Sequence, residues 1–184
     1  LRSDDSYTPG DKSGFRPNYS TITYSNIIKS LYPDVPVIIG GIEASMRRNT
    51  HYDYWSDKVM KPILCDSKAD ILIYGMGEKP TVDLIEYIRK NGKSSILTKN
   101  IELNKLIKIP QISFIVDDIS SLNKEDYILL SSFEESSNNK QKFAENYKII
   151  EQECDKYESK ILVEKVGDKY VVINKKNLPM TTEE

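Results

Sequence analysis

The sequence has only two cysteines, one histidine and one tryptophan among its 184 residues. Cys65 and Cys154 are far apart, so they form neither a disulfide framework nor a short-spaced pair for a metal, and a reducing cytoplasm is the expected location. His51 has no short-spaced partner with which to build a tetrahedral zinc site. The sequence also shows no nucleophile–base pair and no P-loop, which argues against an independent hydrolase or transferase.

Charge and hydrophobicity exclude other classes. The formal net charge is −2 and the isoelectric point is about 5.6, which gives no electrostatic footprint for nucleic acid or an anionic membrane. No apolar run approaches the length of a membrane span, and no basic-then-apolar leader is present. With 39% hydrophobic and 29% charged residues, the chain is expected to form one domain, or one domain with a small appendage.

Helical and strand patterns alternate along the first two thirds of the sequence. Apolar runs typical of parallel strands buried on both faces lie at residues 35–39, 71–74 and 112–116. Helices are predicted at residues 19–32, with Tyr24, Ile27, Ile28 and Leu31 on the apolar face, and at residues 77–92, with Val82, Ile85 and Ile88 on the apolar face. Pro80 suits the first turn of the second helix, and Gly92 suits the position after its end.

The last third has a different pattern. A long helix is predicted at residues 140–157, with an apolar stripe of Phe143, Tyr147, Ile150, Cys154 and Tyr157. Residues 136–139 read as the loop before it, and residues 161–166 and 169–173 flank a two-residue turn typical of a β-hairpin. We therefore predict an α/β fold: a Rossmann-like or flavodoxin-like parallel sheet with flanking helices in residues 1–118, then a helix and a hairpin outside that sheet in residues 119–184. Residues 1–18 and 175–184 read as a loop and a tail.

Two predicted strands run into glycine-containing loops that each carry a carboxylate. In an open parallel sheet the ligand crevice lies beyond the carboxyl ends of the strands, so these loops are the candidate site. Glycine adopts positive φ and lets the backbone approach a ligand, but glycine pairs at strand ends also serve simple turns. Glu43 and Glu78 could converge there for acid–base work, or Glu78 could only complement a helix dipole.

The segment between those loops carries paired arginines and a run rich in aromatic residues, HYDYWSD. Arg47 and Arg48 could bind an anion through their planar forks, or remain solvated. The aromatic run could be a packing cluster with hydrogen-bonded polar tips, or a surface presented to another domain or its substrate. We assign no catalytic residue and no metal ligand, and the ligand-binding candidates are Gly40, Gly41, Glu43, Ser45, Arg47, Arg48, His51, Tyr52, Asp53, Trp55, Gly75, Gly77 and Glu78.

The same motifs resemble the YgiQ-type radical SAM proteins. The similarity covers nearly the whole chain and is weakest at residues 93–124. It lies in RSDDSYTPG (Arg2–Gly10), GGIEAS (Gly40–Ser45), RR (Arg47, Arg48), HYDYWSDKV (His51–Val59), ADILIYGMGE (Ala69–Glu78), LLSSFEE (Leu129–Glu135) and KILVEKVGDKYVVIN (Lys160–Asn174).

The resemblance implies a [4Fe–4S] cluster and S-adenosylmethionine in the full-length protein, yet the CxxxCxxC run that holds such a cluster is missing. It identifies this chain as a piece: most of an N-terminal accessory domain, preceded by earlier strands and followed by the barrel that carries the cluster. No cofactor is expected in this chain alone; the GG and GMGE turns are similar to those of cobalamin-binding domains, which makes cobalamin the one possible ligand that the resemblance suggests. The expected role is ligand binding or substrate presentation without catalysis, and the alternative is a structural module. The expected partners are the barrel of its own chain and a second copy, not nucleic acid or membrane.

Overall fold

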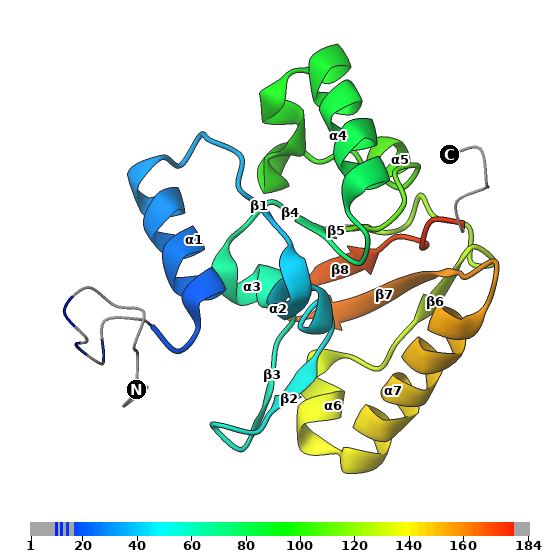
Figure 1. The fold of residues 1–184 in the computed structure, drawn as a ribbon. Helices are drawn as coiled ribbons and strands as arrows, with labels where there is room; N and C mark the ends of the chain where they lie inside the picture. Colours follow the sequence, from blue (N-terminus) through cyan, green and yellow to red (C-terminus); the bar gives the residue numbers. More distant parts are fainter. Residues whose placement is uncertain (1–9, 11, 13, 15–16, 179–184) are drawn as a thin grey trace.

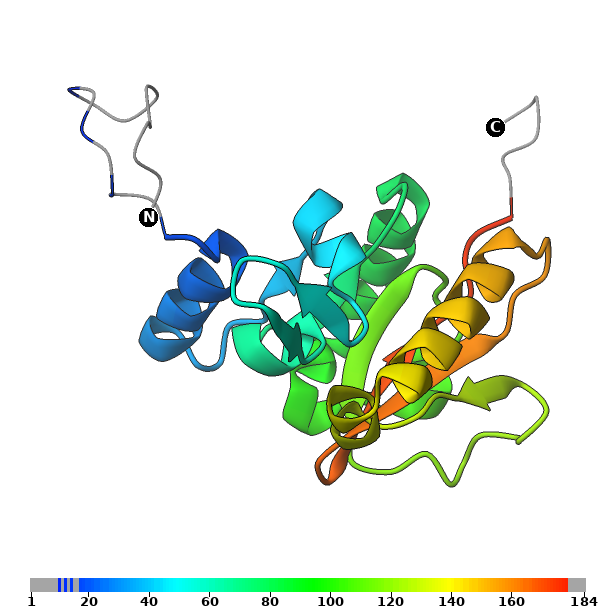
Figure 2. The ribbon, with the colours of Figure 1, turned by 90° about the horizontal axis from the view of Figure 1, so that it is seen from below.

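The structure, a computed structural model that describes residues 10, 12, 14 and 17–178, has a six-stranded sheet with helices on both faces (Figures 1 and 2). The strands of this sheet are β1 (Ile38–Ile39), β4 (Ile71–Ile73), β5 (Ile112–Val116), β6 (Tyr127–Leu129), β7 (Ile161–Val166) and β8 (Lys169–Ile173), and β2 (His51–Asp53) and β3 (Lys58–Met60) form a separate hairpin. The helices are α1 (Ser20–Leu31), α2 (Gly41–Met46), α3 (Ile63–Ser67), α4 (Glu78–Asn91), α5 (Leu103–Leu106), α6 (Phe133–Asn138) and α7 (Lys140–Asp155), with short 3₁₀ turns η2 (Lys93–Ile96) and η3 (Thr98–Asn100). Among the described residues, no helix is long and apolar enough to span a membrane.

The strands lie in the order β1-β4-β5-β8-β7-β6, and the sheet is mixed. β1 pairs parallel to β4, with Ile38 opposite Ile71, so the expected parallel pairing of these two strands is confirmed. The expected direction of β5 is wrong, because β5 runs antiparallel to β4, with Ile71 opposite Phe114. The first strand is also shorter than expected, since only two of residues 35–39 are in a strand.

Gln111 explains why β5 is antiparallel. The backbone N–H of Tyr74, just after β4, donates to the Gln111 carbonyl at 3.0 Å, and the Gln111 side-chain amide donates to the Tyr74 and Met76 carbonyls at 2.9 and 3.2 Å. The chain therefore re-enters the sheet at the end where β4 stops, and it must run back beside it.

The C-terminal hairpin forms with its expected bounds, β7 and β8 around Gly167, but it lies inside the sheet. β8 pairs with β5 and β7 pairs with β6, so the expectation that the hairpin lies outside the sheet is wrong. Strands from both sides of the predicted boundary at residue 118 share one sheet. The α/β class, with helices on the sheet and a C-terminal helix and hairpin, is confirmed.

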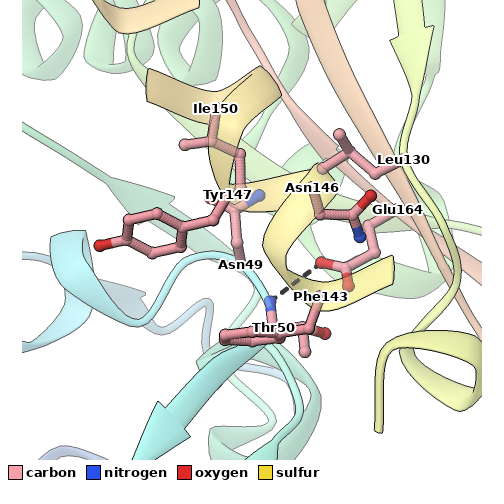
Figure 3. Close-up of a pocket in the computed structure, with 8 residues that line it drawn as sticks. All are labelled: Asn49, Thr50, Leu130, Phe143, Asn146, Tyr147, Ile150 and Glu164. Carbon is pink, nitrogen blue, oxygen red and sulfur yellow. Dashed lines mark hydrogen bonds between the residues drawn. The ribbon is translucent and has the colours of Figure 1, made fainter. Parts of the chain in front are cut away.

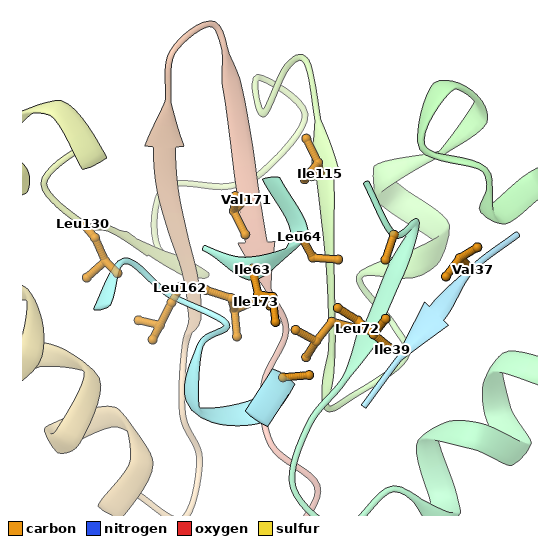
Figure 4. Close-up of a cluster of buried hydrophobic side chains, with 12 residues drawn as sticks. Val37, Ile39, Ile63, Leu64, Leu72, Ile115, Leu130, Leu162, Val171 and Ile173 are labelled. Carbon is orange, nitrogen blue, oxygen red and sulfur yellow. The ribbon is translucent and has the colours of Figure 1, made fainter. Parts of the chain in front are cut away.

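Two apolar cores lie on opposite faces of the sheet. One packs strand side chains against α2, α3 and α7 and includes Leu64, Leu72, Ile115 and Val171 (Figure 4). The other packs the opposite side chains, such as Phe114 and Val172, against α4, η2 and α5. Neighbouring residues Val171 and Val172 face different cores, as the two-residue period of a strand requires.

The amphipathic pattern of α1 is turned outward. Its predicted apolar face, expected to pack on the sheet, is solvent-exposed: the exposed fractions of Tyr24, Ile27, Ile28 and Leu31 are 52%, 50%, 42% and 66%. The opposite side faces the domain, where Ile22 packs against the core, Asn26 donates to the Asp66 carbonyl and Lys29 pairs with Asp70 at 2.9 Å. β1 beside it is an edge strand, and Ile38 is 44% exposed.

Two other expected helix faces and one expected loop need correction. In α4 Leu84 is buried in the core and Ile88 packs against it as predicted, while Val82 and Ile85 are exposed. In α7 the expected stripe is only partly covered, because Tyr147 and Cys154 are exposed and Asn146 and Glu153 are buried. The expected loop at residues 136–139 is mostly helix α6, which begins with a capping box from Ser132 and Glu135. Most of the expected loop at residues 1–18 and the end of the tail lie outside the described residues.

Candidate functional site

The two glycine loops lie side by side at the carboxyl ends of β1 and β4. Gly40 caps α2, Gly77 caps α4, and the Gly75 N–H donates to the Ser45 hydroxyl at 3.3 Å. The parallel pairing of β1 with β4 thus brings these residues together, as their positions in the sequence predicted.

Packing within the chain accounts for two of these glycines. A Cβ on Gly40 would lie 3.2 Å from the Ile73 carbonyl oxygen, and one on Gly75 would lie 2.6 Å from the Gln111 side-chain nitrogen. Gly41 and Gly75 both have positive φ, +81° and +68°, which favours glycine, but only beside Gly41 is the space open among these three glycines.

A polar network ties the loop after β1 to α1 and to the β2–β3 hairpin. Glu43 accepts from the Thr21 hydroxyl at 2.6 Å and from Arg47 at 3.1 Å. Arg47 also reaches Asp53 at 3.7 Å and lies over the Tyr19 ring. The guanidinium of Arg47 is therefore engaged inside the chain.

Arg48 is engaged in the same way. It donates to the Ser45 carbonyl at 2.6 Å and lies 4.9 Å from the centre of the Tyr74 ring. Its other amino group lies 3.6 Å from the Cys154 sulfur. The Tyr74 hydroxyl donates to the Asn174 carbonyl, and burial raises its pKa. The anion-binding role of the paired arginines stays a prediction.

Asp53 anchors the β2–β3 hairpin. It is 2% exposed and accepts from the Tyr19 hydroxyl at 2.6 Å and from the Ser56 N–H and hydroxyl at 3.1 and 2.6 Å. The hydrogen bonds from Ser56 and Tyr19 hold the pKa of Asp53 below its usual value. Next to it, His51 Nδ1 lies 3.1 Å from the Asn49 carbonyl, and burial lowers the pKa of His51.

The tip of this hairpin is a pair of aromatic side chains in contact, Tyr54 and Trp55, which we call the aromatic tip; their ring planes are tilted by 32°. Their ring centres are 4.7 Å apart, and the residues are 67% and 76% exposed. Tyr52 is also exposed and donates to Asp57 at 2.6 Å. The interpretation of the whole run as a buried packing cluster therefore fails at the tip. Only the base of the hairpin is fixed by buried groups.

Glu43 and Glu78 do not form a pair in the structure. Glu43 is held by Thr21 and Arg47, whereas Glu78 is exposed in the first turn of α4. That position fits the interpretation of Glu78 as a residue that complements the helix dipole.

A second polar cluster, with no signal in the sequence, lies where the start of β2 meets α7 and β7 (Figure 3). Glu164 is fully buried, and one carboxylate oxygen accepts from the Thr50 N–H at 3.0 Å. Its other oxygen, the Asn49 amide nitrogen and the Thr50 hydroxyl have no hydrogen-bond partner among the described residues. Burial raises the pKa of Glu164 to about 7.

The two cysteines do not fit an iron–sulfur cluster. Cys65 lies half-buried on α3, where burial raises the pKa of its thiol to about 12, and Cys154 is exposed on α7. Two thiols cannot supply three cysteine ligands. Within the part of the chain that the structure describes, no group of three or more His, Cys, Asp or Glu side chains is placed to hold a metal.

Residues 1–184 match the protein family described as Radical SAM N-terminal. The chain is 48% identical to a UPF0313 protein of Bacteroides thetaiotaomicron, over 100% of this chain and 30% of that protein. It is 47% identical to a UPF0313 protein of Clostridium botulinum and 42% identical to one of Clostridium perfringens, over 27% and 26% of their lengths. The chain thus spans less than a third of these relatives. No solved structure gives a significant match.

Proposed function

The chain belongs to the Radical SAM N-terminal family, and we propose that it is a non-catalytic accessory domain that docks, through the aromatic tip, on the rest of the same protein. The rest of the protein would hold the [4Fe–4S] cluster and S-adenosylmethionine, since the cysteines of this chain do not fit a cluster. The family's chemistry would take place there, in the cytoplasm.

The exposure of the aromatic tip carries this proposal. Tyrosine and tryptophan are the residues that most often dominate binding energy at protein interfaces, and exposed pairs of large aromatic side chains mark such sites. The base of the hairpin is already fixed by Asp53, so docking would order few additional groups. A rigid hairpin with an exposed apolar tip is therefore well suited to bind a preformed surface.

Ligand binding or substrate presentation at the glycine loops, with cobalamin as one ligand, is the second candidate. The open space beside Gly41 favours it. Docking ranks first because packing within the chain accounts for Gly40 and Gly75.

Hydroxyl-radical footprinting of the full-length protein tests the docking. Tyr54 and Tyr157 are an internal pair of the same residue type, 67% and 65% exposed in this chain. If the aromatic tip docks, Tyr54 and Trp55 oxidise several-fold more slowly than Tyr157 in the full-length protein. Equal oxidation rates for Tyr54 and Tyr157 would contradict the proposal.

A further inference from the structure

A lysine-rimmed groove lies at the amino end of β4, the end opposite the glycine loops. Its volume is about 500 Å³, within the range of sites that bind small molecules. Asp70, which precedes β4, is part of its wall, whereas Gly75 and Gly77 follow the same strand. The groove is therefore separate from the candidate site described above.

The rim of the groove is strongly cationic although the whole chain is slightly acidic. Its lysines come from five separate parts of the fold: Lys29, Lys61, Lys68, Lys99 and Lys169. The only carboxylate among its lining residues belongs to Asp70. Because a concave surface lined by charges of one sign concentrates their field, the groove attracts anions more strongly than isolated surface lysines do.

Asp70 neutralises only one of these lysines. It is buried, and its oxygens accept from Lys29 and the Val37 N–H at 2.9 Å each, and from the Thr98 N–H and hydroxyl at 2.9 and 3.1 Å. This carboxylate has no capacity left for another lysine. Its hydrogen bonds hold α1, β1 and η3 together as the wall of the groove.

The other four lysines are weakly paired or unpaired. Lys99 and Lys169 reach Asp34 and Asp117 at 3.3 and 3.5 Å, but both carboxylates are more than four-fifths exposed, so solvent screens these pairs. Within the described part of the chain, Lys61 and Lys68 form no ion pair, although Lys61 lies over the Phe133 ring. The groove thus has a net positive charge that a ligand can use.

The floor of the groove is apolar. It is formed by the side chains of Leu64, Ala69, Leu97, Ile115 and Val166. Leu64 and Ile115 belong to the packed core shown in Figure 4, so the floor is a firm surface. Cys65 also lines the groove, but its raised pKa of about 12 keeps it a neutral thiol.

We propose that this groove binds a small molecule in which a phosphate or carboxylate group is joined to an apolar or aromatic body. The anionic group lies among the lysine ammonium groups, which act as point charges for phosphate. The body lies on the apolar floor.

Pyridoxal 5′-phosphate is a suitable probe, because it has the required chemistry and marks nearby lysines. Its aldehyde condenses with an unprotonated lysine amine to an imine with loss of water, and borohydride then reduces the imine by delivering hydride to its carbon. Mass spectrometry of the full-length protein counts the label at each lysine. We expect labelling of Lys68 and Lys169 to exceed labelling of Lys148, an exposed lysine of α7 outside the groove, by about tenfold at low probe concentration.

Two comparisons decide the result. K169Q should reduce labelling of Lys68 several-fold, because it removes part of the phosphate attraction, while the matched control K148Q should not change it. Inorganic phosphate should compete with the probe about tenfold more weakly than unreactive pyridoxine 5′-phosphate does, because it has no aromatic ring to pack on the apolar floor. Three outcomes would each overturn the proposal. The groove and control lysines could be labelled equally, or the two anions could compete equally. The groove lysines could also stay unlabelled because other polypeptide covers them.

Discussion

Replacing Glu164 with glutamine should stabilise the fold at neutral and alkaline pH. The buried carboxyl has a pKa of about 7, against an ordinary value of 4.5 in the unfolded chain. Below pH 4.5 the Glu164 carboxyl is protonated in both the folded and the unfolded state, so its titration does not lower the free energy of unfolding. Between pH 4.5 and 7 the unfolded state ionises and the folded state does not, so stability falls as pH rises, and above pH 7 the cost is constant. A shift of this size corresponds to an upper limit of about 3 kcal/mol.

The expected result for E164Q is therefore a difference that depends on pH. The glutamine amide oxygen can still accept from the Thr50 N–H, and its NH₂ group can donate to the Thr50 hydroxyl, which has no partner now. Urea unfolding of the 184-residue chain, followed by the circular dichroism of its helices, should show E164Q and the parent equally stable at pH 4.5. At pH 8 E164Q should be more stable by up to about 3 kcal/mol.

The control is E151Q, which removes an exposed carboxylate of α7 and should change the free energy of unfolding by less than about 0.5 kcal/mol at either pH. A stability difference for E164Q that is the same at pH 4.5 and pH 8, or a less stable E164Q at pH 8, would refute the assignment of burial as the cause of the raised pKa.

Three further predictions concern other parts of the chain. D70A should lower the free energy of unfolding in urea by about 3 kcal/mol, because it leaves Lys29 and three neutral donors without their shared acceptor. Reconstitution of this chain with iron and sulfide should give no stoichiometric [4Fe–4S] absorbance, and a full cluster on Cys65 and Cys154 alone would contradict this prediction. Light scattering of the 184-residue chain at micromolar concentration should show self-association through the apolar face of α1 and the open edge of β1. I28D should lower the measured mass, and a monomeric parent chain would contradict the prediction.

Local features of the fold were predictable where a residue type restricts the backbone. Gly167 defined the hairpin turn, and Gly92 marked the end of α4, because both residues adopt positive φ. The direction of β5 was predicted wrongly because burial on both faces, which is typical of parallel strands, is also found here in an antiparallel strand: every residue of β5 is buried. It depends on Gln111, whose contacts with the end of β4 are 37 and 35 residues away in sequence.

The candidate site was predictable in part for a similar reason. Glycines that follow parallel strands converge through the sheet, so Gly40 and Gly75 could be placed together from the sequence. The rim of the groove could not be placed, because its lysines are scattered between Lys29 and Lys169 and only the tertiary fold collects them. Glu164 gave no signal either, since a glutamate followed by a lysine in a strand is normally expected to face solvent.

The exposed face of α1 shows the limit of such reasoning most clearly. Periodicity at Tyr24, Ile27, Ile28 and Leu31 predicted the helix correctly, yet it carried no information on what covers the apolar side. The opposite side of the helix forms specific contacts, such as the salt bridge between Lys29 and Asp70. These contacts fix the orientation of the helix, and burial of its apolar stripe does not. We expect other polypeptide to cover this apolar stripe, because exposed patches of this kind favour association. The strand order also favours a contact here, since β1 is an edge strand of the sheet beside this helix. The surface formed by α1 and β1 is therefore the part of the described chain at which we expect a contact with other polypeptide, as the light-scattering prediction tests.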